Sequence, residues 1–215
     1  MTTPNRHRPH EHRDHHDHHG QSHGFDEETA RWYVENYGDH PTNRMTVALA
    51  RLEPDDLVVD VGCGGGEAIR EAAARVPEGK AIGVDPSAAM MRIARELSDS
   101  HAGRKRIEFV EGRAEKLPLP DASATVVVAI NSLHHWENAA AGLAEVMRVL
   151  RPDGRLLVTD EEAEPDKFGH GDGDLTDPAR VLAIIKDAGF VDVCFSKHTE
   201  GDVRMLAVTA RKDVV

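Results

Sequence analysis

The chain has 215 residues, 40% of them hydrophobic and 30% charged, and its formal net charge is −12. This composition predicts one soluble domain with an appendage, and the negative charge disfavours binding to nucleic acid or anionic membranes. The two cysteines, Cys63 and Cys194, follow no metal-ligand spacing, and no apolar run is long enough to span a membrane. The N-terminus lacks the apolar core of a signal peptide, so the sequence predicts a cytoplasmic protein.

Residues 1–24 form a low-complexity, His-rich tail that holds eight of the chain's 14 histidines. Arg, Asp, Pro and Gly separate the histidines, so this tail cannot bury a core and is predicted to be disordered. Imidazoles at this density bind transition metals in a test tube, but we predict a solvated or regulatory tail and no dedicated metal site. A metal-handling protein built on this tail is an alternative.

Residues 25–51 have a helical pattern that is interrupted at His40-Pro41. Thr42 or Asn43 is the expected cap of the second helix. Three of the chain's nine aromatic residues lie within six positions of this segment: Trp32, Tyr33 and Tyr37. The segment is interpreted either as a lid that closes over a bound ligand or as a helix pair packed on the sheet edge.

Residues 57–66 contain an apolar run that ends at Asp60 and breaks into a glycine cluster, after which a helical pattern begins at Glu67. This pattern predicts a buried parallel strand, a tight loop and a helix N-terminus. Helix N-termini present free N–H groups to polar or anionic ligands, and glycines let a ligand approach the backbone closely. We therefore predict a nucleotide-like cofactor site at Asp60–Gly66.

The spacing of these glycines separates two classes of cofactor site. The dinucleotide fingerprint G-x-G-x-x-G would require glycine where Glu67 stands. The sequence instead has Asp60 followed by glycine at every second position. This arrangement resembles motif I of the class I methyltransferases that use S-adenosylmethionine, whose cationic amino and sulfonium groups suit a carboxylate. The resemblance implies a cofactor contact by each of these residues: Asp60, Gly62, Cys63, Gly64 and Gly66.

A second apolar strand, predicted at residues 81–85, ends in Asp85, 19 residues after Gly66. An acid at about this offset accepts hydrogen bonds from ribose hydroxyls. The alternative is an ordinary helix cap, because Pro86 and Ser87 open the next helix. In both interpretations Asp85 and Pro86 lie at the carboxyl edge of the sheet, where ligands of open α/β folds bind.

A third strand, predicted at residues 106–110, leads into Glu111–Leu119. This stretch resembles the family's adenine-binding turn, which usually reads Gly-Asp-Ala-Glu followed by Leu-Pro. Arg113 replaces the aspartate, and a guanidinium has no hydrogen-bond acceptor for the adenine amino group. Adenine recognition is therefore expected either through backbone groups around Ala114 or through stacking on Arg113.

The most apolar strand, predicted at residues 125–130, should be central in the sheet. It continues into Asn131–Trp136, which corresponds in the family to the strand end that faces the transferable methyl group. The Asn/Asp-Pro-Pro-aromatic tetrad of many nucleic-acid and protein N-methyltransferases is absent, which disfavours a base amino group as acceptor. The resemblance implies that Asn131 contacts the cofactor. The candidate catalytic residues are His134, His135 and Tyr33, with His40 and Tyr37 as further candidate bases.

The run Glu145–Leu157 resembles the family signature before the fifth strand, with Asp153 in place of the usual glycine at a left-handed turn. Residues 161–177 are predicted to form an acidic loop, either at the acceptor entrance or simply solvated. A last helix precedes two antiparallel strands near the C-terminus. The resemblance, over roughly residues 40–210, implies an α/β, Rossmann-like fold with a seven-stranded, mostly parallel sheet, one antiparallel strand, and helices on both faces.

The chain looks most like the small-molecule methyltransferases related to the ubiquinone and menaquinone biosynthesis enzymes. The resemblance implies a transferase that moves a methyl group from S-adenosylmethionine to a small-molecule acceptor by in-line displacement. Two alternatives are kept: a non-catalytic module that binds S-adenosylmethionine, and an NAD-dependent oxidoreductase with a related fold.

Overall fold

A computed structural model describes residues 26–162, 175 and 177–214. The predicted disordered tail (1–24) and most of the predicted acidic loop (161–177) lie outside the described residues. None of the helices in the described part of the chain combines the length and apolarity that a membrane crossing requires.

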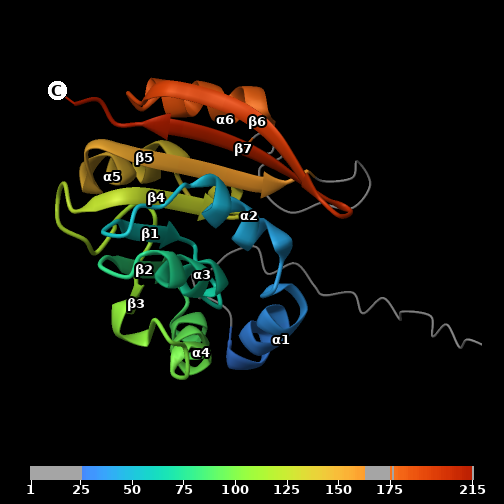
Figure 1. Ribbon diagram of the computed structural model, residues 1–215. Helices are drawn as coiled ribbons and strands as arrows, with labels where there is room; N and C mark the ends of the chain where they lie inside the picture. Colours follow the sequence, from blue (N-terminus) through green and yellow to red (C-terminus); the bar gives the residue numbers. More distant parts are fainter. Residues whose placement is uncertain (1–25, 163–174, 176, 215) are drawn as a thin grey trace, which may run out of the picture.

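One seven-stranded sheet organises the molecule, with the strand order β3-β2-β1-β4-β5-β7-β6 (Figure 1). The first five strands in sequence are parallel, and β7 runs antiparallel to both of its neighbours. This topology confirms the predicted fold. The strands are β1 (Leu57–Val61), β2 (Lys80–Asp85), β3 (Ile107–Glu111), β4 (Ala124–Ile130), β5 (Leu150–Glu161), β6 (Val191–Glu200) and β7 (Val203–Arg211).

Helices cover both faces of this sheet and pack against two hydrophobic cores. Val58 and Val126 belong to a core shared with α2, α3 and α4, whereas Val59 and Val127 belong to a core shared with α5 and α6. Burial on both faces explains why β1 and β4 read as continuous apolar runs. The helices are α1 (Glu27–Tyr37), α2 (Pro41–Leu49), α3 (Glu67–Arg75), α4 (Ala88–Ser98), α5 (Ala139–Val149) and α6 (Pro178–Asp187), with short 3-10 turns η1 (Arg104–Arg106) and η2 (Leu133–His135).

The start of α2 differs from the prediction. His40, and neither Thr42 nor Asn43, is the N-cap, and its Nδ1 accepts the backbone N–H of Thr42 at 3.4 Å. Pro41 interrupts the helical pattern in the sequence, but its fixed φ suits the first helical position, so the helix begins at the proline. The predicted left-handed turn at Asp153 is confirmed by a φ of 63°.

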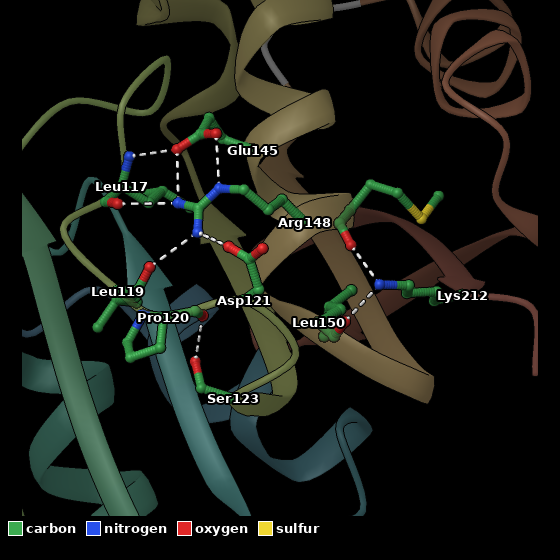
Figure 2. Close-up of polar contacts among 10 residues, drawn as sticks. Leu117, Leu119, Pro120, Asp121, Ser123, Glu145, Arg148, Leu150 and Lys212 are labelled. Carbon is green, nitrogen blue, oxygen red and sulfur yellow. Dashed lines mark hydrogen bonds and ion pairs between the residues drawn. The ribbon is translucent and has the colours of Figure 1, made fainter.

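Arg148 of α5 holds the segment between β3 and β4 in place (Figure 2). Its guanidinium donates to the carbonyl oxygens of Leu117 and Leu119, to Asp121 and to both carboxylate oxygens of Glu145. Glu145 in turn accepts the backbone N–H of Leu117 at 2.8 Å, and the guanidinium lowers the pKa of this carboxyl. This contact set fixes residues 117–121 on α5, just after the predicted adenine-binding turn.

Replacing Arg148 with alanine should lower the free energy of unfolding by about 2 kcal/mol, because two backbone carbonyls and two carboxylates lose a charged donor that is only partly exposed. Arg148→Lys should recover only part of this loss, since an ammonium cannot span the same acceptors. Arg75→Ala, which removes an exposed ion pair with Glu71, is the control and should cost less than about 0.5 kcal/mol. Urea denaturation measures all three; equal losses in Arg148→Ala and Arg75→Ala would contradict the anchoring role.

Candidate active site

A cavity of about 380 Å³ lies where the carboxyl ends of β1, β2 and β4 meet. Its wall joins residues that are far apart in the sequence, from α1, from the glycine turn and from the segments that follow β2, β3 and β4. The lining residues are Tyr33, Val61, Gly62, Gly64, Asp85, Pro86, Ser87, Met90, Gly112, Arg113, Ala114, Glu115, Asn131, Ser132, His135, Trp136 and Glu137.

The glycine turn serves both packing and access. Gly62 has a φ of 85°, and a Cβ there would lie 2.6 Å from the Ser132 Cβ. Gly66 has a φ of 78°, and a Cβ there would lie 2.5 Å from the Phe109 ring. A Cβ on Gly64, by contrast, would meet no atom of the described chain within 4 Å. Gly62 and Gly64 therefore form the cavity wall, while Gly66 allows the start of α3 to pack closely.

Asp85 joins the glycine turn to the start of α4. Its Oδ2 accepts the backbone N–H of Gly64 at 3.1 Å, and its Oδ1 accepts that of Ser87 at 2.9 Å. Ser87 is the N-cap of α4, so Asp85 is not the ordinary cap considered in the alternative interpretation. Burial raises the pKa of Asp85, although these two N–H groups partly offset the shift. The carboxyl lines the cavity beside Pro86.

Asp60 lies at the end of β1 and is only 3% exposed. Its Oδ1 has no hydrogen-bond partner among the described residues. Burial, with a further contribution from the negative charge of Asp85, raises the pKa of Asp60 to about 8. A buried carboxyl without a partner is costly, which makes Asp60 a candidate for compensation by a bound cationic group. Neither Asp60 nor Cys63, which is buried within the turn, is among the residues that line the cavity.

The predicted adenine-binding turn forms a second part of the cavity wall. Arg113 pairs with Glu137, and both residues line the cavity. Ala114 is buried and also lines it, so backbone groups near Ala114 are available to a ligand. The guanidinium is engaged by a carboxylate, but its N–H groups bind in the plane and leave its face open, so recognition of adenine by the backbone and stacking on Arg113 both stay predictions.

The end of β4 supplies the third wall. Asn131, with a φ of 48°, and His135 line the cavity, whereas His134 does not. His134 Nδ1 lies 3.0 Å from Asp160 Oδ1, and its ring centroid is 4.0 Å from that of His135. Trp136 also lines the cavity, and its buried Nε1 finds no hydrogen-bond partner in the described parts of the chain.

α1 lies at the end of the sheet to which the arrowheads of β4 and β5 point (Figure 1). Tyr33 reaches the cavity from this helix, and burial raises the pKa of its phenol. Its ring centroid is 5.2 Å from that of Tyr37, which in turn contacts Trp32 at 5.8 Å. Trp32 and Tyr37 are about half exposed, so this aromatic cluster borders the cavity on the solvent side.

Sequence reasoning missed several lining residues. Met90, Ser132, Trp136 and Glu137 are absent from the predicted site but form part of its wall. Ser132 and Trp136 lie in the same six-residue stretch as predicted residues, which was an available signal. Met90 and Glu137 carry no such signal, because only the packing of α4 and of the segment after η2 brings them to the cavity.

Together, the strand order and a cavity at the carboxyl ends of the strands define a Rossmann-like protein whose cavity lies where open α/β folds bind their ligands. The model of a methyltransferase domain matches residues 59–158. A structure of an S-adenosylmethionine-dependent methyltransferase from Aquifex aeolicus has a TM-score of 0.72, 23% identity, and covers 87% of this chain and 99% of that one.

Curated relatives agree with this match. The chain is 35% identical over 152 residues to 27-O-demethylrifamycin SV methyltransferase of Amycolatopsis mediterranei, covering 68% of this chain and 53% of the relative. It is 33% identical over 116 residues to a ubiquinone/menaquinone biosynthesis C-methyltransferase of Ectopseudomonas mendocina, covering 54% and 45%. The chain thus spans about half the length of these relatives.

The chain contains a class I S-adenosylmethionine-dependent methyltransferase domain, and S-adenosylmethionine is the cofactor of this class. The site fits such a cofactor: the open backbone at Gly64 allows close approach, and Asp60, a buried carboxyl with an unpaired Oδ1, lies two residues before the cavity-lining Gly62.

Proposed function

We propose that this protein transfers a methyl group from S-adenosylmethionine to a small-molecule acceptor. The observation that carries the proposal is the single cavity that brings Gly62, Gly64, Asp85 and the end of β4 together. The named relatives support the same reaction class. Bound S-adenosylmethionine supplies an electrophilic methyl group. The protein's contribution is to hold the acceptor atom in line with it, at a distance of about 3–3.5 Å.

The cofactor-binding roles follow from the chemistry of each wall. Asp85 accepts hydrogen bonds from the ribose hydroxyls, and Pro86 packs beside them. Asp60 does not line the cavity, so its negative charge would act on the cationic amino-acid end of the cofactor across the turn from Gly62 to Gly66, which includes Cys63. Backbone groups near Ala114 hold the adenine, with Arg113 fixed beside it by Glu137. Asn131 closes this half of the cavity.

The acceptor side is assigned to Tyr33, His134 and His135. Of the two histidines, His135 lines the cavity and is the proposed base that takes a proton from the acceptor. His134 lies against it, and its Nδ1 is 3.0 Å from Asp160 Oδ1 without making a hydrogen bond. This proton transfer is required only for an acceptor such as a phenol, an alcohol or a carbon acid. The proposed lid is confined to α1, which covers the cavity through Tyr33, because α2 is packed into the core. The proposal also includes a cytoplasmic location and a regulatory or solvated tail.

Calorimetry with S-adenosylhomocysteine tests the proposal directly. We expect one molecule to bind per chain, and we expect NAD to give no binding heat. Transfer of labelled methyl from S-adenosylmethionine to a panel of phenols, alcohols and amines then separates an enzyme from a binding module. Protein that shows no S-adenosylhomocysteine binding at millimolar concentration would sink the proposal.

Replacing His134 and His135 together with alanine should lower turnover by about 100-fold or more, the contribution of a positioned general base, with little change in S-adenosylhomocysteine affinity. Any acceptor methylated by the wild type serves for the measurement. His198→Ala on β6, outside the cavity, is the control and should retain full turnover. Wild-type turnover in the double variant would remove both histidines from the mechanism.

A further inference from the structure

A closed ring of polar contacts joins the start of α2 to the cavity-lining end of β4. Asn131 Nδ2 donates to Thr42 Oγ1 at 2.9 Å, and Thr42 Oγ1 lies 2.9 Å from His40 Nδ1. His40 Nε2 lies 3.2 Å from Glu161 Oε2, and the backbone N–H of Glu161 donates to Asn131 Oδ1 at 2.8 Å. These four residues, called the His40 network below, come from three segments that are distant in the sequence.

The three hydrogen bonds of the His40 network run in one sense, and the fourth contact, between His40 and Glu161, is at ion-pair distance. The Asn131 amide nitrogen can only donate, so the Thr42 hydroxyl accepts from it and donates its own hydrogen to His40 Nδ1. Nδ1 also accepts the Thr42 backbone N–H, as the cap of α2. An imidazole whose Nδ1 accepts carries its hydrogen on Nε2, the atom that faces the Glu161 carboxylate. The geometry of the network therefore places the His40 hydrogen on Nε2.

Buried hydrogen bonds fix the position of the His40 network. Thr42 is fully buried, and its carbonyl oxygen accepts from Thr46 Oγ1 at 2.7 Å. Thr46 Oγ1 also lies 2.7 Å from Thr159 Oγ1, and the Thr159 carbonyl accepts the Asn131 N–H at 2.8 Å. A shift of the network would leave buried polar groups unpaired. The same contacts hold Asn131 in its left-handed conformation, which is otherwise unfavourable.

The His40 network also fixes the connection between α1 and α2. Residues 38–40 link the two helices, Asn43 Nδ2 donates to the Gly38 carbonyl, and His40 is held by Glu161. α1 carries Tyr33, which lines the same cavity as Asn131. The His40 network thus joins two parts of the cavity wall, one from α1 with Tyr33 and one from the sheet with Asn131.

We infer that His40 and Glu161 are positioning residues that set the shape of the cofactor cavity through Asn131 and the α1–α2 connection. Neither residue lines the cavity. This inference rests on the proposed function, in which the cavity holds S-adenosylmethionine. It replaces the sequence-based suggestion that His40 is a candidate base, because its Nδ1 already accepts the Thr42 hydrogens and its Nε2 hydrogen faces a carboxylate.

The test is calorimetry of S-adenosylhomocysteine with full-length variants. His40→Asn retains an oxygen that can cap α2 but lacks the Nε2 donor, and should raise Kd about tenfold, the effect of one lost charged hydrogen bond. Glu161→Ala should have the same effect. Glu161→Gln retains an acceptor for Nε2–H and should stay within about threefold of the wild type. Arg44→Gln removes the ion pair with Glu200 from the same helix and should leave Kd unchanged.

The double variant His40→Asn/Glu161→Ala separates positioning from general loss of stability. Because both substitutions break the same network, the double variant should bind about as well as either single variant. If the two substitutions acted independently, their fold-changes in Kd would multiply. Nitrogen NMR of the histidines should find His40 as the Nε2–H tautomer at neutral pH. Multiplying effects, unchanged Kd in both single variants, or an Nδ1–H tautomer would overturn the inference. Failure of the wild type to bind would instead overturn the proposed function on which it rests.

Discussion

Replacing Asp85 with alanine is expected to weaken S-adenosylhomocysteine binding by about tenfold or more. The Asp85 carboxylate lines the cavity and holds the backbone N–H groups of Gly64 and Ser87. Its loss removes the acceptor proposed for the ribose hydroxyls and frees the turn at Gly64. Hydrogen bonds to a charged group contribute about 1.5–3 kcal/mol each, so one lost bond accounts for a tenfold change. Calorimetry at neutral pH measures the effect.

Asp85→Asn separates these two contributions. The amide retains one oxygen, which can accept either a backbone N–H or a ribose hydroxyl but carries no charge. Its affinity should lie between those of the alanine variant and the wild type. Asp177→Gly, which removes the cap of α6 outside the cavity, is the control and should change Kd by less than about threefold. Unchanged affinity in Asp85→Ala would refute the ribose role.

The fold could be predicted because its strongest signals are local. β1 and β4 are buried on both faces, so each reads as a continuous apolar run, and the glycines between β1 and α3 mark a turn that other residues adopt poorly. The start of α2 could not be placed, because a histidine is an uncommon cap and the proline was interpreted only as a break.

The candidate site was predicted where one residue carries the chemistry and missed where several elements must meet. Asp85 and the glycine turn follow directly from strand ends, and the structure brings them into one cavity. The pairing of Arg113 with Glu137, and of His40 with Glu161, depends on how distant segments pack. No local pattern encodes such pairs, so they became visible only in three dimensions.

Replacing Asp60 with asparagine should reduce the pH dependence of stability. The pKa of Asp60 is raised to about 8 in the folded protein, chiefly by burial, from an unfolded value of about 3.8. Between these values the folded state retains a proton that the unfolded state loses, so this residue lowers stability as pH rises from about 4 to about 8. The difference in free energy of unfolding between Asp60→Asn and the wild type should therefore increase, in favour of the variant, over this window, by on the order of a few kcal/mol.

The same substitution should weaken cofactor binding, because the residue that destabilises the free protein is the one proposed to compensate a cationic ligand. The ammonium group of S-adenosylhomocysteine favours the charged form of Asp60, so binding below about pH 8 should release a proton. Affinity should rise between about pH 6 and about pH 7.5 in the wild type and remain flat in Asp60→Asn. Calorimetry in two buffers of different ionisation enthalpy counts the released proton. Equal proton release in both proteins would mean that Asp60 stays neutral in the complex, and the role of this carboxyl toward the cofactor would have to be abandoned.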